Sequence, residues 1–375
     1  MSAVRSFLRR EPVLLIASAA ALISCLFVPP DRFYLAYFDL RTLALLYCLM
    51  TVVAGLRGAG LFAHLAHTLC EKAPNVRVVA LVLVLLCFFS AMLITNDVAL
   101  LTFVPFAVVV MGMADGGKDS LIRIVVLQTV AANLGSMLTP VGNPQNLYLY
   151  SFYDLGFSAF VSTTLPYWLL SLLGVCLGCL TLPKAPLPVF LGEEPGLDTR
   201  TLVLHLALFL LCLAVVLRVL SWPVMLVVLV AVLLIFDRRV LLKADFLLLL
   251  TFAAFFIFSG NLARIGTVDR LLRRLLAGKE YLVSLLASQF ISNVPAALLL
   301  SGFTAGAREL LLGVNIGGLG TPIASLASLI GMKLYSHSEH AHTGRYLVDF
   351  TLVNVVFLLL LSLFHMLLQR APWFT

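Results

Sequence analysis

Two stretches of the chain, Asn133-Leu-Gly-Ser-Met-Leu-Thr-Pro140 and Asn315-Ile-Gly-Gly-Leu-Gly-Thr-Pro322, share the pattern N-x-G-x-x-x-T-P. Each follows a second shared element, Ile94-Thr95-Asn96 in the first half of the chain and Ile291-Ser292-Asn293 in the second. Polar, Gly- and Pro-bearing breaks at corresponding places of two apolar halves are typical of membrane proteins built from internal repeats. The spacing therefore predicts a duplicated fold with a shared polar site at the breaks.

The composition predicts an all-α membrane protein with a single transmembrane domain over residues 1–375. Hydrophobic residues make up 62% of the chain, charged residues 11%, and the mean hydropathy is +1.07. Soluble domains are about a quarter charged, and apolar runs long enough to cross a bilayer recur along most of this chain. The lipid bilayer is therefore an expected partner. Nucleic acid is not, because no basic stripe is interleaved with aromatic residues.

The apolar runs predict spanning helices and two hairpins. The spans are expected near residues 13–29, 39–56, 120–149, 160–182, 202–219, 222–236, 246–260, 309–335 and 346–368, with breaks around 139–144 and 317–322. Residues 77–113 and 281–304 instead carry a polar tip between two apolar arms. These are predicted to be re-entrant hairpins, which enter and leave the membrane on one side, with tips buried in protein or lining a wet cavity.

The number of crossings predicts how the two halves are related. Repeat 1 covers about 13–182 and repeat 2 about 222–368, and each holds two spans, a hairpin, a broken span and a final span. An even number of crossings would leave the two repeats pointing the same way. The linker span at about 202–219 inverts the second, which predicts two inverted-topology repeats.

Positive charge predicts a cytoplasmic amino terminus in the cell inner (plasma) membrane. The run from Val13 to Val28 follows Arg5, Arg9 and Arg10 but lacks a clear cleavage site, so it is expected to be the first span rather than a signal peptide. Most loop Lys and Arg residues then lie inside. The basic stretch 264–279 would lie outside, where long side chains on an interfacial helix can snorkel.

The helix breaks carry the candidate site residues. Unwound carbonyls and Asn, Ser or Thr oxygens can ligate Na+, and half-helix N-termini attract anions. The candidate substrate-binding residues are Asn96, Asn143, Asn146, Asn293, Thr139, Thr321 and Ser325. The candidate coupling-ion residues are Thr95, Asn96, Asp97, Asn133, Gly135, Gly142, Ser292, Asn293, Asn315 and Gly317. The alternative is kinked helices with local Ser and Thr bonding, which a single motif would favour and the matched pair does not.

Asp97 differs from the other tip residues because it is the only carboxylate at either tip. Val294 stands at the corresponding place in the second half. An ionisable group at membrane depth is costly unless it is paired, hydrated or protonated, so it suggests a function. Asp97 is expected to ligate a cation or carry a coupling proton. The alternative is a charge at a helix start that faces a wet vestibule.

The segments Thr95-Asn-Asp-Val-Ala-Leu-Leu-Thr102 and Thr139-Pro-Val-Gly-Asn-Pro-Gln-Asn146 resemble the ion transporter superfamily. That group includes citrate permeases, arsenite-efflux permeases, one type of Na+/H+ antiporter and divalent-anion:sodium symporters, and the resemblance covers essentially the whole chain. It implies a Na+ or substrate role for the two tips and for the breaks at 139–146 and 317–325. Two features depart from the symporters. Thr-Asn-Asp and Ser-Asn-Val replace Ser-Asn-Thr at the tips, and Thr321-Pro-Ile-Ala-Ser325 lacks the Asn-Pro-Gln-Asn of the first break.

The sequence thus predicts a secondary active transporter of a small anion, coupled to Na+ or H+, with no cofactor, and a homodimer is a candidate assembly. A Na+/H+ antiporter or an arsenite-type efflux permease is the alternative. An intramembrane enzyme is disfavoured because Asp97 is the only deep carboxylate, and a channel because inverted repeats favour alternating access. The histidines of residues 337–342 are expected in a solvated loop rather than a metal site.

Overall fold

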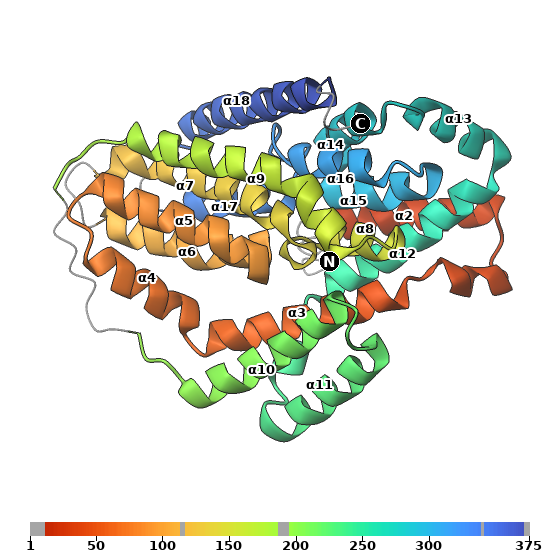
Figure 1. Ribbon diagram of the computed structural model, residues 1–375, viewed down its shortest axis with the longest axis horizontal. Helices are drawn as coiled ribbons and strands as arrows, with labels where there is room; N and C mark the ends of the chain where they lie inside the picture. Colours follow the sequence, from red (N-terminus) through yellow and green to blue (C-terminus); the bar gives the residue numbers. More distant parts are fainter. Residues whose placement is uncertain (1–11, 113–116, 187–194, 339–340, 371–375) are drawn as a thin grey trace, which may run out of the picture.

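The computed structural model describes residues 12–112, 117–186, 195–338 and 341–370, which are almost wholly helical (Figure 1). Among these residues the only extended pairing is an isolated β-bridge between Asn75 and Pro186. The predicted all-α class is confirmed.

The described residues of the first half of the chain form eleven helical elements. They are α2 (Pro12–Phe27), η1 (Arg32–Tyr37), α3 (Leu40–Gly58), α4 (Leu61–Glu71), α5 (Val76–Ile94), α6 (Asn96–Gly112), α7 (Gly117–Gly135), η2 (Ser136–Leu138), η3 (Pro140–Gly142), α8 (Pro144–Phe152) and α9 (Phe157–Leu180). The helix α10 (Thr199–Val216) follows and leads into the second half.

The second half repeats this order of elements. It contains α11 (Trp222–Phe236), η4 (Val240–Leu242), α12 (Phe246–Arg264), α13 (Gly266–Leu276), α14 (Glu280–Ile291), α15 (Asn293–Leu300), η5 (Ser301–Phe303), α16 (Ala307–Ile316), α17 (Leu326–Ser336) and α18 (Thr343–Gln369). In the first half α5 and α6 are joined at one residue and are followed by α7, an interruption and α8. In the second half α14 and α15 are joined in the same way and are followed by α16, an interruption and α17. The predicted breaks therefore lie between α7 and α8 and between α16 and α17.

Seven of the described helices are long and apolar enough to cross a membrane, which confirms a multi-span membrane protein. They are α3, α5, α7 together with η2, α9, α10, α12 and α18. The helix α5, the first arm of a predicted hairpin, is long enough to cross alone, whereas α6, α14 and α15 are shorter. The window Ser120–Leu138 is 89% buried, against 22% to 61% for the other spans, so the helix before the first break is the centre of the bundle.

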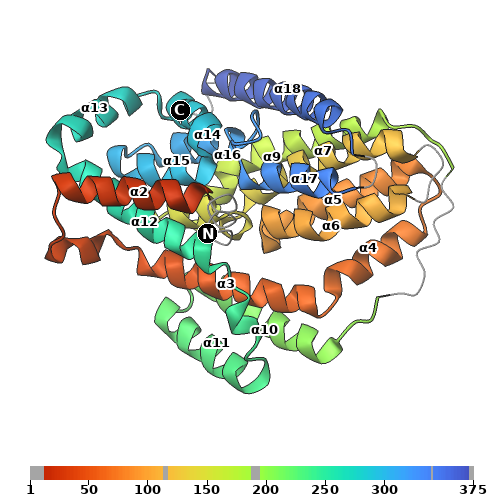
Figure 2. The ribbon, with the colours of Figure 1, turned by 180° about the vertical axis from the view of Figure 1, so that it is seen from behind.

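The two hairpin-like pairs lie in different parts of the molecule, and each contacts helices of both halves of the chain. The helices α5 and α6 pack on α7, while α14 and α15 pack on α16 (Figure 1). The second arm α6 also packs on α17 of the other half (Figure 2). The second arm α15 packs on α8. Each second arm therefore contacts the helix that follows the break of the opposite half.

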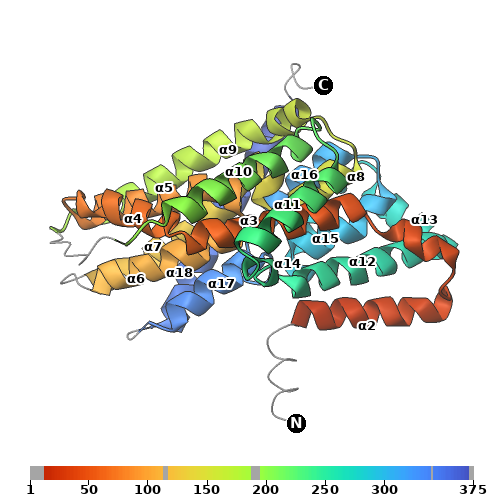
Figure 3. The same cartoon turned by 90° about the horizontal axis from the view of Figure 1, so that it is seen from below.

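The remaining helices form a second group beside this bundle. The helix α2 packs along α12, and α3 packs on α10 and α11 (Figure 3). An ion pair of 2.7 Å between Arg264 and Asp31 joins the end of α12 to the turn η1. The hydrogen bond from Arg264 lowers the pKa of the Asp31 carboxyl from its usual value.

Candidate functional site

The two predicted tips adopt the same unusual backbone. Thr95 joins α5 to α6 with φ 72° and ψ 149°, and Ser292 joins α14 to α15 with φ 70° and ψ 153°. A positive φ with this ψ is normally reserved for glycine and costs about 1–3 kcal/mol at any other residue, and such outliers cluster at functional sites. Two separate outliers of one kind at corresponding positions indicate that the tips were selected for this geometry.

The asparagine after each tip closes the turn in the same way. The Oδ1 of Asn96 accepts a hydrogen bond from the backbone N–H of Asp97, and the Oδ1 of Asn293 accepts one from Val294, both at 2.9 Å. These oxygens satisfy free N–H groups at the start of each second arm. Asn96 and Asn293 are both buried, and their Oδ1 atoms serve the turns themselves.

The threonine of each N-x-G-x-x-x-T-P motif ties the break to the first arm of its own hairpin. The hydroxyl of Thr139 donates to the carbonyl of Met92, and that of Thr321 donates to the carbonyl of Gln289 at 3.0 Å. Met92 and Gln289 lie at the same place before their tips. Thr139 also accepts a hydrogen bond from the N–H of Gly142 and so caps the η3 turn.

The first glycine of each motif allows the broken helix to approach that first arm closely. A Cβ on Gly135 would lie 2.1 Å from the carbonyl oxygen of Phe88, and one on Gly317 would lie 2.9 Å from the Cα of Leu285. Phe88 and Leu285 again hold corresponding positions. A side chain larger than hydrogen cannot fit at either place without a shift of the backbone.

The asparagine of each motif binds the other half of the chain. Asn133 Nδ2 donates to Ser328 Oγ at 3.3 Å, and Asn315 Nδ2 donates to Asn146 Oδ1 at 2.7 Å. Ser328 and Asn146 lie equally far beyond their own motif asparagines. The two breaks are thus joined by a reciprocal pair of hydrogen bonds.

A chain of contacts also brings the two tips to this centre. Asn133 Oδ1 accepts from Asn96 at 3.1 Å and from the hydroxyl of Ser325 at 2.8 Å. The backbone N–H of Asn293 donates to the carbonyl of Ala324 at 2.9 Å. Ala324 therefore contacts the second tip directly, and its neighbour Ser325 is linked to the first tip through Asn133, so the two tips and the two breaks form one connected cluster.

A cavity of about 540 Å³ lies at the first tip and the first break, bounded by α3, the η4–α12 connection and α17. Of the predicted site residues, Thr95, Asp97 and Asn143 line it. Asp97 Oδ1 and Asn143 Oδ1 are buried atoms without a hydrogen-bond partner among the described residues. Buried acceptors normally have a partner, so these two oxygens are available to a ligand.

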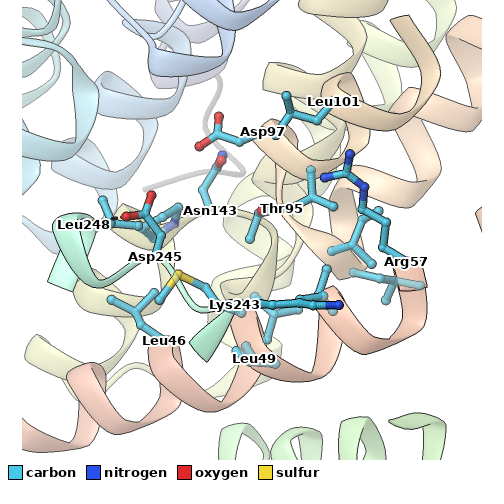
Figure 4. Close-up of a pocket in the computed structure, with 18 of the residues that line it drawn as sticks. Leu46, Leu49, Arg57, Thr95, Asp97, Leu101, Asn143, Lys243, Asp245 and Leu248 are labelled. Carbon is cyan, nitrogen blue, oxygen red and sulfur yellow. Dashed lines mark hydrogen bonds between the residues drawn. The ribbon is translucent and has the colours of Figure 1, made fainter. Parts of the chain in front are cut away.

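The cavity also has charged residues from other elements. Arg57 at the end of α3, Lys243 after η4 and Asp245 at the start of α12 line it. In Figure 4 the cationic ends of Arg57 and Lys243 lie toward one side, and the carboxylates of Asp97 and Asp245 toward the other. Asp245 caps α12 by accepting the N–H of Leu248 at 2.9 Å.

The sequence did not predict that Arg57 and Lys243 belong to the site. Their positions at the ends of predicted spans were the available signal, since such residues reach back along a helix end. The other predicted site residues do not line the cavity. They are Asn96, Asn133, Gly135, Thr139, Gly142, Asn146, Ser292, Asn293, Asn315, Gly317, Thr321 and Ser325.

No three His, Cys, Asp or Glu residues gather to hold a metal ion within the described part of the chain. His340, in the predicted histidine loop, lies outside that part, as do the amino-terminal arginines used for the predicted orientation.

Residues 5–311 match the citrate transporter family, CitMHS, within the ion transporter superfamily. The chain belongs to this family. It is 30% identical over 335 residues to an uncharacterized transporter of Methanocaldococcus jannaschii, covering 89% of this chain and 90% of that protein. It is also 30% identical over 317 residues to the inner membrane protein YbiR of Escherichia coli, covering 82% and 83%. A silicon efflux transporter of rice, Oryza sativa subsp. japonica, is 30% identical over 131 residues, which is 35% of this chain and 26% of that protein.

Membership of this family confirms the predicted resemblance and makes the chain a membrane transporter. Its matched motifs form the cluster described above, and the cavity beside them is the candidate site of a transported molecule.

Proposed function

We propose that the chain is a secondary active transporter of a small anion, coupled to Na+ or H+ by alternating access. The observation that carries this proposal is the cavity at the first break. It presents two unpartnered oxygens, on Asp97 and Asn143, opposite the cations of Arg57 and Lys243. A volume of about 540 Å³ suits a small carboxylate or oxyanion.

The proposal assigns separate roles to the two sides of the cavity. Arg57 and Lys243 attract and bind the anion, since neither is ion-paired with another described residue. Thr95, Asp97 and Asn143 provide oxygens for the coupling ion or proton. Asn96 acts through its neighbours, because its side chain is committed to Asp97 N–H and to Asn133.

We further propose that the two halves are inverted-topology repeats and that α5–α6 and α14–α15 are re-entrant hairpins. The repeated element order, the matched tips and the reciprocal asparagine bonds support this, because a twofold relation in the membrane plane produces contacts in equivalent pairs. We also propose that the chain lies in the inner membrane with its amino terminus in the cytoplasm, and that a homodimer is a candidate assembly.

A second candidate is the efflux of a small neutral acid that carries several hydroxyl groups. Asp97 and Asn143 supply acceptors for hydroxyl donors, and the silicon efflux transporter of rice is a relative. When Asp97 is ionised, the positive charges of Arg57 and Lys243 balance the negative charges of Asp97 and Asp245. The cavity then has no net charge, so it also suits a neutral molecule.

The test is a thermal-shift screen of the purified chain against small carboxylates, oxyanions and neutral hydroxylated acids, with and without Na+. Ligands that stabilise the protein are then followed in proteoliposomes under a Na+ or pH gradient. The proposal requires accumulation against the ligand's own gradient. Flux that only runs downhill, at rates that no ion gradient changes, would indicate a channel instead.

A further inference from the structure

The two helix breaks differ in how their freed carbonyl groups are satisfied. At the second break the side chain of Gln289 bonds to backbone groups on both sides of the turn between Gly317 and Thr321. Its Nε2 donates to the carbonyls of Gly317 at 2.7 Å and Leu319 at 2.9 Å, and lies 3.3 Å from that of Leu285. Its Oε1 accepts the backbone N–H of Thr321 at 3.0 Å.

These contacts also fix the orientation of the amide. Three carbonyl oxygens surround the nitrogen, so it must be the donor, and the oxygen faces an N–H group. A group of converging carbonyls around one positively polarised centre is the arrangement that binds a cation at an unwound helix. Here an NH₂ group stands at that centre.

The backbone around Gln289 fits this side chain closely. Gly320 has φ +103°, and a Cβ there would lie 2.3 Å from Gln289 Oε1. Glycine at this position therefore provides both the turn and the space for the amide.

The first break has no such donor at the corresponding place. Met92 stands where the second half has Gln289, and its thioether cannot donate a hydrogen bond. The neighbouring oxygens of Asp97 and Asn143 remain without partners, whereas Val294 replaces Asp97 in the second half and Ser325 is bonded to Asn133. At the second break Asn315 Oδ1 is also without a partner among the described residues, but the carbonyls of Gly317 and Leu319 are already occupied by an NH₂ donor. The first break has no such donor and is open to a cation.

We propose that the side-chain amide of Gln289 takes the place of a cation at the second helix break, so that this transporter binds its coupling ion in the first repeat alone. This inference rests on the proposed function where it calls the cation a coupling ion. The occupation of the second break by the Gln289 amide can be tested without a transport measurement. One ion per cycle is then the stoichiometry expected of the wild-type protein.

The experiment uses Gln289→Glu in an Asp97→Asn background, which removes the first site. The new carboxylate faces the carbonyl oxygens of Gly317 and Leu319. All of these groups are acceptors, so a cation is needed between them. Melting temperatures are measured at pH 8.5 in NaCl, LiCl, KCl and choline chloride of equal concentration. The double variant should be stabilised by several degrees in NaCl or LiCl relative to choline, while Asp97→Asn alone should not.

Gln128→Glu in the same background is the matched control. Gln128 is fully buried and donates to a single carbonyl, that of Phe103 at 3.1 Å, so its carboxylate should destabilise without creating cation dependence. A folded Gln289→Glu double variant that responds no more to NaCl than this control would overturn the proposal. The proposal would also be overturned if lowered pH restored the stability of the double variant and NaCl or LiCl did not, because the second break would then accept a proton but no metal ion.

A second measurement decides the matter if the variant does not fold. The Hill coefficient of the coupling cation, in wild-type transport or in direct binding, should be close to one. Two cooperative cations bound while Gln289 is intact would refute the assignment. Failure of the protein to transport any ligand would refute the proposed function and leave the thermal-shift result standing.

Discussion

The reciprocal asparagine bonds predict a definite order of stability losses. Asn133 makes three side-chain hydrogen bonds across helices, to Asn96, Ser325 and Ser328. Asn315 makes one such bond and a second one within its own helix. Asn354, which is equally buried, makes only a bond within α18. Alanine should therefore destabilise most at Asn133, less at Asn315 and least at Asn354.

The magnitudes follow from the number of bonds lost. An interhelical hydrogen bond in a membrane protein contributes about 0.6 kcal/mol, with a maximum of about 1.7. An orphaned buried partner adds about 1–3 kcal/mol. We expect Asn133→Ala to lose about 2–4 kcal/mol, Asn315→Ala about 1–2, and Asn354→Ala less than about 1. At this chain length the loss expected for Asn133→Ala corresponds to a fall in melting temperature of about 3–6 °C.

The assay is thermal unfolding in detergent, followed by a double-mutant cycle between Asn133→Ala and Ser325→Ala. Because these residues share a 2.8 Å bond, their losses should not add. Additive losses in the cycle, or an Asn354→Ala variant as damaged as Asn133→Ala, would mean that the breaks are not held together by these side chains.

Three further predictions concern coupling, packing and the cavity. Asp97→Asn should still bind substrate but lose accumulation against a gradient in proteoliposomes; concentrative transport with unchanged ion dependence would contradict its coupling role. Gly135→Ala should lose more than about 3 kcal/mol or fail to express, because its Cβ would overlap a backbone carbonyl at 2.1 Å, whereas Gly156→Ala, with nothing within 4 Å, should melt normally. Asn143→Ala should raise the KM several-fold, since Asn143 lines the cavity, and should lose only its one buried hydrogen bond to Ser136. Asn146→Ala should lower the melting temperature more, since Asn146 makes three side-chain hydrogen bonds and does not line the cavity; the reverse pattern in transport and melting assays would exclude that division.

The sequence predicted the helical class, the breaks and the positions of both tips, because each depends on local chemistry. Asparagine, glycine and proline that cluster within an apolar run favour a break in the helix, whereas single residues such as Pro105, Pro166 and Asn354 remain inside helices. The turns lie at Thr95 and Ser292 as the matched triplets predicted. Orientation in the membrane and the inverted relation of the repeats stay predictions, since they depend on a bilayer.

The division of labour within the site could not be predicted. Asn133, Asn143 and Asn146 are the same residue type in one segment, yet Asn133 and Asn146 bond to the second half of the chain and Asn143 lines the cavity. Which side chain faces which neighbour depends on contacts between residues far apart in the chain. Arg57 and Lys243 were missed for the same reason, because α3 and η4 meet only in the folded protein.

The hydrogen bonds also indicate where movement can occur. Each tip is tied to its own break by Thr139 or Thr321, and the two breaks are tied to each other, so these parts form one unit. The cavity lies at the edge of this unit. On one side of the cavity Asp97 belongs to the unit, and on the other Lys243 belongs to the group formed by α3 and α12. A ligand held between these two residues bridges the boundary, and its loss leaves both parts internally intact. We therefore expect access to alternate by displacement at this boundary, because ligand and coupling ion then change the contact between two preserved parts rather than the structure of either.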